Sequence, residues 1–151
     1  MKPLLKFVAV VVIGLANSLS AAEDDKRIKE VSDLSSVFWT AMTSDKIPEA
    51  EKSLFVKEDD PEIASSDAIS KRVTEEFEKL SARVKEMGQE KSDGHRFGDV
   101  KEIKVGKIQE QGGRVVASVT LMVWEPREKE FEKVTITWFK TPKSGWKLID
   151  L

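Results

Sequence analysis

Cysteine and tyrosine are both absent from this sequence of 151 residues, and histidine occurs once. Without cysteine the chain can form no disulfide, no thiolate zinc site, no cysteine nucleophile and no lipid anchor on cysteine. A domain of this kind depends on its apolar core for stability. We expect neither a metal nor a cofactor.

An excess of charge of one sign is missing, and so is an apolar run long enough to cross a bilayer. Charged residues make up 34% of the chain, and the 25 basic and 27 acidic side chains are intermixed. The main apolar run, FVAVVVIGLA from Phe7 to Ala16, has only about half of the roughly 20 residues that a membrane-spanning helix needs. The length of the chain suits one domain.

The N-terminus has the three parts of a secretory signal peptide. Lys2 and Lys6 form the basic start, and the apolar run follows it. Small residues, Ser20 and Ala22, occupy the positions that a signal peptidase reads in a cut before Glu23. This pattern predicts cleavage near Ala22, and the alternative is an uncleaved membrane anchor.

Cleavage would leave a single domain over residues 23–151 and remove residues 1–22 as the signal peptide. We therefore expect a secreted or periplasmic protein that has no membrane contact once it is cleaved. The mature domain would keep 23 basic residues against 27 acidic ones. Nucleic acid is not an expected partner, because its phosphates need a basic surface.

Apolar periodicity predicts helices in the first half of the domain. A first helix over residues 26–42 carries one apolar face: Ile28, Val31, Leu34, Phe38 and Met42. Pro48 fits the first turn of a short second helix, and KEDDPE at 57–62 indicates a loop. A third helix over residues 65–88 has the strongest stripe: Ile69, Val73, Phe77, Leu80, Val84 and Met87. It is too short to require a coiled coil, and we expect it to lie on a sheet of the same domain.

The second half of the domain changes to a period of two, which is typical of strands. Strands are predicted over residues 100–110, 114–124, 131–140 and 146–151. Short turns separate them, so they should form an antiparallel meander. Helices first and strands afterwards indicate the α+β class, with N-terminal helices packed on a curved four-stranded sheet. The chain end SGWKLIDL is then a paired strand.

The two faces of this sheet differ in character. Val115, Ala117, Val119, Leu121 and Val123 make one face aliphatic, and the helices should cover it. The other face carries an apolar strip: Met122, Trp124, Phe131 and Phe139. We expect this strip to be an interface, for a homodimer or an unknown protein partner, with Trp124 near its centre. The alternative is that the turn EPREKE folds over the strip.

Two stretches resemble the nuclear transport factor 2-like superfamily. VFWTAMTSDKIPEAEKSLFV is similar to the opening of those domains, and VTITWFKTPKSGWKLIDL is similar to their closing hairpin. The resemblance implies a cone-shaped α+β roll whose helices pack on the concave face of the sheet. The superfamily includes isomerases, dehydratases and many non-enzymatic binding or assembly modules, so fold alone does not choose between them.

The chemistry of enzymatic members is hard to match in this chain. Their tyrosine-dependent sites have no counterpart here, because the chain has no tyrosine. The remaining candidates for an acid–base role are His95, Asp93 and Asp99, and the alternative is a polar loop that leads into the first strand. We interpret Glu58, Asp59 and Asp60 as part of a solvated turn, and the alternative is that they attract a calcium ion.

Tryptophan is the other residue type that suggests binding. Trp39, Trp138 and Trp146 could line a pocket for an apolar ligand, and the alternative is that they fill the core. Together these observations favour a non-enzymatic binding or assembly module. The alternative function is a small-molecule isomerase or dehydratase with a pocket inside the roll.

Overall fold

The computed structural model describes residues 21–88, 90–111 and 113–151. All but the last two positions of the predicted signal peptide therefore lie outside the described residues. The helices come first: α2 (Ala21–Thr43), α3 (Ile47–Glu51), the short 3-10 helix η2 (Lys57–Asp59) and α4 (Ser66–Met87). The strands follow: β1 (Lys91–Ser92), β2 (His95–Arg96), β3 (Val100–Gln111), β4 (Arg114–Glu125), β5 (Glu130–Thr141) and β6 (Gly145–Asp150). The α+β prediction is confirmed.

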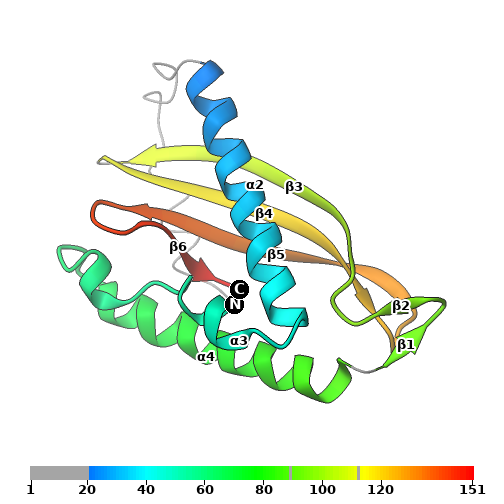
Figure 1. Ribbon diagram of the computed structural model, residues 1–151. Helices are drawn as coiled ribbons and strands as arrows, with labels where there is room; N and C mark the ends of the chain where they lie inside the picture. The colour runs from blue at the N-terminus through cyan, green and yellow to red at the C-terminus, as the bar shows by residue number, and fades with distance from the viewer. Residues whose placement is uncertain (1–20, 89, 112) are drawn as a thin grey trace.

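The four long strands form the predicted antiparallel meander in the order β3-β4-β5-β6. β4 and β5 stay in one register over their whole length, from Val115 opposite Lys140 to Glu125 opposite Glu130. β6 is half as long and pairs only with residues 137–141 of β5. Figure 1 shows a bent sheet in which the edge strand β6 covers only the C-terminal part of β5.

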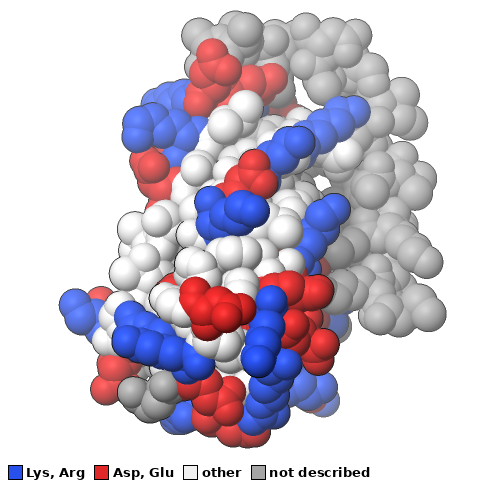
Figure 2. Space-filling model, turned by 90° about the vertical axis from the view of Figure 1, so that its right-hand side faces the viewer, with Lys and Arg blue, Asp and Glu red and all other residues white. Residues whose placement is uncertain are grey.

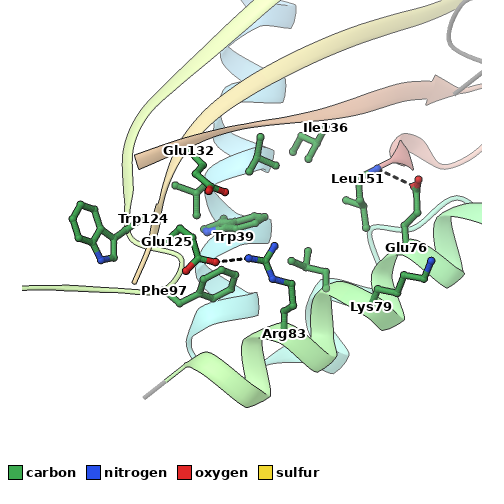
Figure 3. A pocket seen from close by; sticks show the side chains of 13 residues that line it. Trp39, Glu76, Lys79, Arg83, Phe97, Trp124, Glu125, Glu132, Ile136 and Leu151 are labelled. Carbon is green, nitrogen blue, oxygen red and sulfur yellow. Dashed lines mark hydrogen bonds and ion pairs between the residues drawn. The ribbon is translucent and has the colours of Figure 1, made fainter. Parts of the chain in front are cut away.

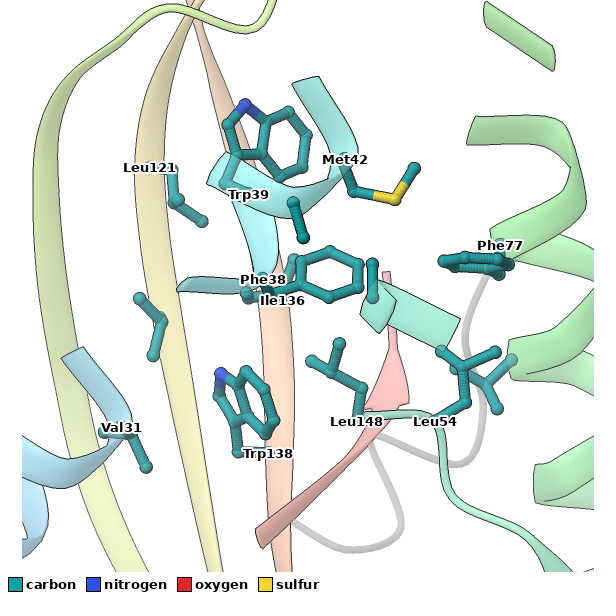
Figure 4. Close-up of a cluster of buried hydrophobic side chains, with 14 of the residues drawn as sticks. Val31, Phe38, Trp39, Met42, Leu54, Phe77, Leu121, Ile136, Trp138 and Leu148 are labelled. Carbon is teal, nitrogen blue, oxygen red and sulfur yellow. The ribbon is translucent and has the colours of Figure 1, made fainter. Parts of the chain in front are cut away.

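The helices lie on one face of this sheet. α2 crosses the sheet diagonally, and α4 runs alongside the β6 edge (Figure 1). The aliphatic face of β4 is buried beneath them, as its alternation predicts, and Trp138 and Leu148 of β5 and β6 are fully buried there. Figure 4 shows Phe38 and Met42 of α2 in the same core, together with Phe77 of α4. Burial of this apolar surface is the main favourable term in folding.

Most of the predicted helix stripes reach the core. All of the α4 stripe is buried except Leu80, which is half-buried. In α2 the exceptions are Ile28, which is 40% exposed, and Leu34, which is half-buried. Pro48 lies in the first turn of α3 as predicted. The chain end is a strand, and Leu148 donates its N–H to Ser53 and accepts the N–H of Phe55, so β6 is held from both sides.

The apolar strip on the outer face of the sheet is less exposed than we expected for an interface. Trp124 and Phe139 are only 5% and 6% exposed, so the described chain already buries two of the four strip residues. Phe139 packs in a second cluster with Phe55 at a ring-centroid distance of 6.0 Å, and Ile69 of α4 joins that cluster. The segment between α3 and α4 thus wraps around the β6 edge, which the local pattern of the strands could not indicate.

A small hairpin covers the other end of the strip. β1 and β2 pair antiparallel with Ser92 opposite His95, and Asp93 and Gly94 form the turn with φ values of 51° and 82°. Two consecutive positive φ values are typical of the tight hairpin turn that favours an Asp-Gly pair. Ser92 accepts the indole N–H of Trp124 at 3.0 Å. This hairpin therefore covers Trp124.

The acidic KEDDPE segment is used inside the fold. Arg114 donates from Nε and Nη2 to the two oxygens of Asp60, at 2.6 and 3.0 Å, and Asp60 is almost fully buried. The hydrogen bonds from the Arg114 guanidinium hold the pKa of the Asp60 carboxyl below its usual range. Asp59 accepts the backbone N–H of Val56 at 2.9 Å. These contacts fasten the loop before α4 to the start of β4.

Candidate ligand cavity beside the edge of β5

A cavity of about 410 Å³ lies between α4 and the half of β5 that β6 does not reach. Figure 3 looks into it, with β5 on one side, α4 on the other and Trp39 of α2 at the bottom. Ligand sites are commonly concave and apolar and measure about 300–1,000 Å³. The size and position of this cavity make it the candidate functional site of the described chain.

Each wall follows from a simple periodicity. On β5 the alternate residues Glu132, Val134 and Ile136 face the cavity, because residues two apart in a strand share one face. On α4 a ridge of residues spaced by three and four faces it: Glu76, Lys79, Leu80 and Arg83. β4 contributes Val123 and Glu125, and the segment before β3 contributes Phe97.

The bottom of the cavity is held in place by a glycine. The indole N–H of Trp39 donates to the carbonyl of Gly98 at 2.7 Å, so this ring presents apolar surface to the cavity rather than a free donor. Gly98 has a φ of 92°, and a Cβ built there would lie 2.3 Å from Cγ2 of Thr43. Only glycine fits this close approach without strain.

One end of the cavity carries a charge pair in which the carboxylate is buried and the guanidinium is half exposed. Arg83 of α4 donates to Oε1 of Glu125, and the backbone N–H of Arg127 donates to Oε2 of the same carboxylate at 2.7 Å. The guanidinium carbon of Arg83 also lies 5.2 Å from the ring centroid of Phe97. Glu125 is 6% exposed, so this carboxylate needs both donors to compensate for its lost hydration.

The opposite end is closed by Leu151, whose N–H donates to Oε1 of Glu76 at 3.1 Å. Two other charged side chains lie on the rim of the cavity, and they are not paired in the way that Arg83, Glu125 and Glu76 are. Lys79 and Glu132 are exposed, and neither forms a hydrogen bond or ion pair with the residues that the structure describes. In Figure 3 Lys79 lies near Leu151 and Glu132 lies at the other end.

The residues predicted for an acid–base role lie elsewhere. His95 is on the outer side of the sheet, where its ring packs 4.8 Å from that of Trp124 and 5.2 Å from that of Phe131. Its Nδ1 is 3.7 Å from the Asp99 carboxylate, and both side chains are more than two-fifths exposed. Asp93 is in the exposed turn of the β1–β2 hairpin. None of the three lines the cavity.

The tryptophans divide between cavity and core. Trp39 lines the cavity, whereas Trp138 and Trp146 do not. Trp138 is fully buried and donates its indole N–H to Ser35 at 2.8 Å, and Trp146 donates to Glu30 at 3.2 Å. Trp124 is at the margin of the cavity, and Figure 3 shows its indole directed away from it.

Sequence reasoning missed most of the polar lining. Arg83 and Glu125 are 42 positions apart, and nothing in the local pattern distinguishes Arg83 from the solvated charges around it. The Asp-Gly pair at residues 93–94 was the available signal for the hairpin, since that dipeptide favours tight turns. Within the described residues, no cluster of three or more His, Asp or Glu side chains could hold a metal ion.

A scan of protein-family models, a search of curated proteins and a search of solved structures found no match to this chain. The resemblance to nuclear transport factor 2-like domains therefore stays a prediction. Among the described helices, none combines the length and the apolar character needed to cross a membrane.

Proposed function

We propose that this protein is a secreted or periplasmic binding module without catalytic activity, of the nuclear transport factor 2-like type, and that its ligand occupies the cavity beside β5. The observation that carries the proposal is the lining of that cavity. Apolar side chains from α2, α4 and the sheet form its walls, and the buried carboxylate there, on Glu125, has both oxygens occupied.

The alternative, an isomerase- or dehydratase-type enzyme, needs an acid–base group that faces the ligand. His95, Asp93 and Asp99 do not line the cavity. Of the charged groups that do, Glu125 accepts donors at both oxygens and Glu76 accepts the N–H of Leu151, whereas Lys79 and Glu132 lie exposed on the rim rather than enclosed with the ligand. A module that holds an apolar group agrees better with this arrangement. Figure 2 shows acidic and basic side chains side by side on one face of the molecule, which favours neither nucleic acid nor another strongly charged partner.

An apolar fluorescent probe tests the proposal. Anilinonaphthalene sulfonate should bind the folded protein at one site, and Leu80→Phe should weaken binding by about tenfold or more, because the added ring occupies the cavity. Val37→Phe is the matched control, since Val37 is 66% exposed on α2 and does not line the cavity. Absence of saturable binding, or equal binding by the Leu80→Phe protein, would contradict a cavity ligand.

A further inference from the structure

Within the described residues, the half of β5 that borders the cavity is an unpaired sheet edge. β5 spans Glu130–Thr141, yet its pairing with β6 covers only residues 137–141. In the described part of the chain no other strand pairs with residues 130–136 on that side. An edge strand presents a row of N–H and C=O groups that can bond to another chain.

Protection against edge-to-edge aggregation does not by itself explain the cavity beside this open edge of β5. Charged residues such as Glu130, Glu132 and Lys133 do discourage edge-to-edge aggregation, as charges on edge strands generally do. A protected edge, however, needs no cavity next to it. Here Val134 and Ile136 of the same edge line an apolar space that continues to α4. The unpaired backbone and the side-chain pocket therefore occur together.

Building on the proposed function, we propose that the ligand is an extended peptide segment that adds to β5 as an antiparallel strand, with one apolar side chain in the cavity. Such strand addition takes affinity from main-chain hydrogen bonds and specificity from pockets for alternate side chains. The segment would continue the line of β6 past Leu151, and the sheet would stay antiparallel throughout. Its N-terminal end would then lie beside Leu151 and its C-terminal end beside Glu130.

The rim charges specify the chemistry of the peptide. Lys79 near Leu151 and Glu132 near the other end are the two lining charges without partners among the described residues. Side chains on one face of a strand recur every second residue, about 6.6 Å apart. The segment should therefore carry an acidic residue, then an apolar one, then a basic one, at alternate positions from its N-terminal end. Leucine suits the middle position, between Leu80 and Val134.

The peptide Thr-Asp-Val-Leu-Val-Lys-Thr, labelled with fluorescein at its N-terminus, tests this inference by fluorescence anisotropy with the full chain. It should bind saturably and displace anilinonaphthalene sulfonate. N-methylation of the Leu and Lys amides and N-methylation of the two Val amides form a matched pair, because each set modifies two amides on one side of the strand. Only one of these sets faces β5, so one modification should weaken binding by about tenfold or more and the other should not.

Charge reversal tests the direction of the peptide. The double variant Lys79→Glu and Glu132→Lys should prefer the peptide in which Asp and Lys are exchanged, whereas the native protein should prefer the original order. The control variant, Lys71→Glu with Glu78→Lys, reverses two exposed charges of α4 that do not line the cavity, and it should keep the native preference.

The outcomes separate the two proposals. If the probe binds the cavity but the peptide does not bind or does not displace it, strand addition is overturned and the cavity function stands. Equal effects of the two N-methylated sets, or no exchange of preference on charge reversal, would also overturn strand addition. If neither probe nor peptide binds, both proposals fail.

Discussion

Residues 137–141 of β5 are paired with β6, whereas residues 130–136 of the same strand have no strand on that side in the described chain. In the paired half Thr137, Trp138 and Phe139 are buried, with the sheet covered on both faces. In the unpaired half Glu130, Glu132 and Lys133 are exposed. The two halves of one strand thus differ in pairing and burial, because a shorter neighbour leaves part of its edge open. Tight packing is concentrated at one end of the sheet, and the proposed binding site lies at the other.

The largest expected effect comes from removing the partner of the paired half. Deletion of residues 146–151 takes away Leu148, which is fully buried, and Ile149, which is 5% exposed. Truncating one such leucine to alanine typically costs about 2–5 kcal/mol, which is a large share of the roughly 5–15 kcal/mol that stabilises a domain. The shortened protein should show no cooperative unfolding in circular dichroism. A melting curve like that of the intact chain would show that β6 is dispensable.

A matched pair of substitutions compares the two halves directly. Trp138→Ala in the paired half should lower the free energy of unfolding by about 3–5 kcal/mol, because it leaves a cavity and an unpaired Ser35 hydroxyl. Val134→Ala in the unpaired half should lower it by less than about 1.5 kcal/mol, since that side chain already borders a cavity. Urea unfolding measures both. Similar losses at the two positions would remove the distinction between the halves.

The Asp60–Arg114 pair tests whether the paired end also depends on a buried charge. Removing one partner of such a pair costs about 3 kcal/mol or more, so Asp60→Asn should be clearly less stable than the native protein at neutral pH. The depressed pKa of Asp60 means that the pair stabilises the fold above the ordinary aspartate pKa of about 3.9 and loses this effect as the pH falls through the lower pKa of the folded state. The difference between the two proteins should therefore shrink on acidification. A difference that stays constant from neutral pH to strong acid would contradict this role.

A smaller effect than the loss of Trp138 is expected at the glycine that holds the bottom of the cavity. Gly98→Ala should cost about 1–3 kcal/mol, because it combines a left-handed backbone with a Cβ pressed against Thr43. Gly94→Ala is the control, since Gly94 has a similar φ of 82° but nothing within 4 Å of its Cβ position. Gly98→Ala should also weaken probe binding, whereas Gly94→Ala should not. Equal stability losses would mean that only the backbone conformation matters.

Much of this fold could be predicted because it depends on local periodicity. The strand bounds agree to within a residue or two, and the α4 stripe and the aliphatic face of β4 reach the core as expected. The burial of Trp124 and Phe139 on the outer face of the sheet could not be predicted from local periodicity. Trp124 is covered by a hairpin that lies about 30 residues away in the chain, and Phe139 is covered by Phe55 and Ile69 from the segment before α4 and its first turns.

In this chain the alternation of strands and the spacing of helices specify which apolar residues face the core. They also specify the order of the helices and strands, because these patterns depend on residues close together in the sequence. The candidate site depends on other information. Arg83 meets Glu125, Arg114 meets Asp60 and Trp39 meets Gly98 across 42, 54 and 59 positions. Such contacts form only once the bent sheet and the helices are packed, and the open half of β5 exists only because β6 is short. Their physical origin is the packing of distant elements, which no local pattern records.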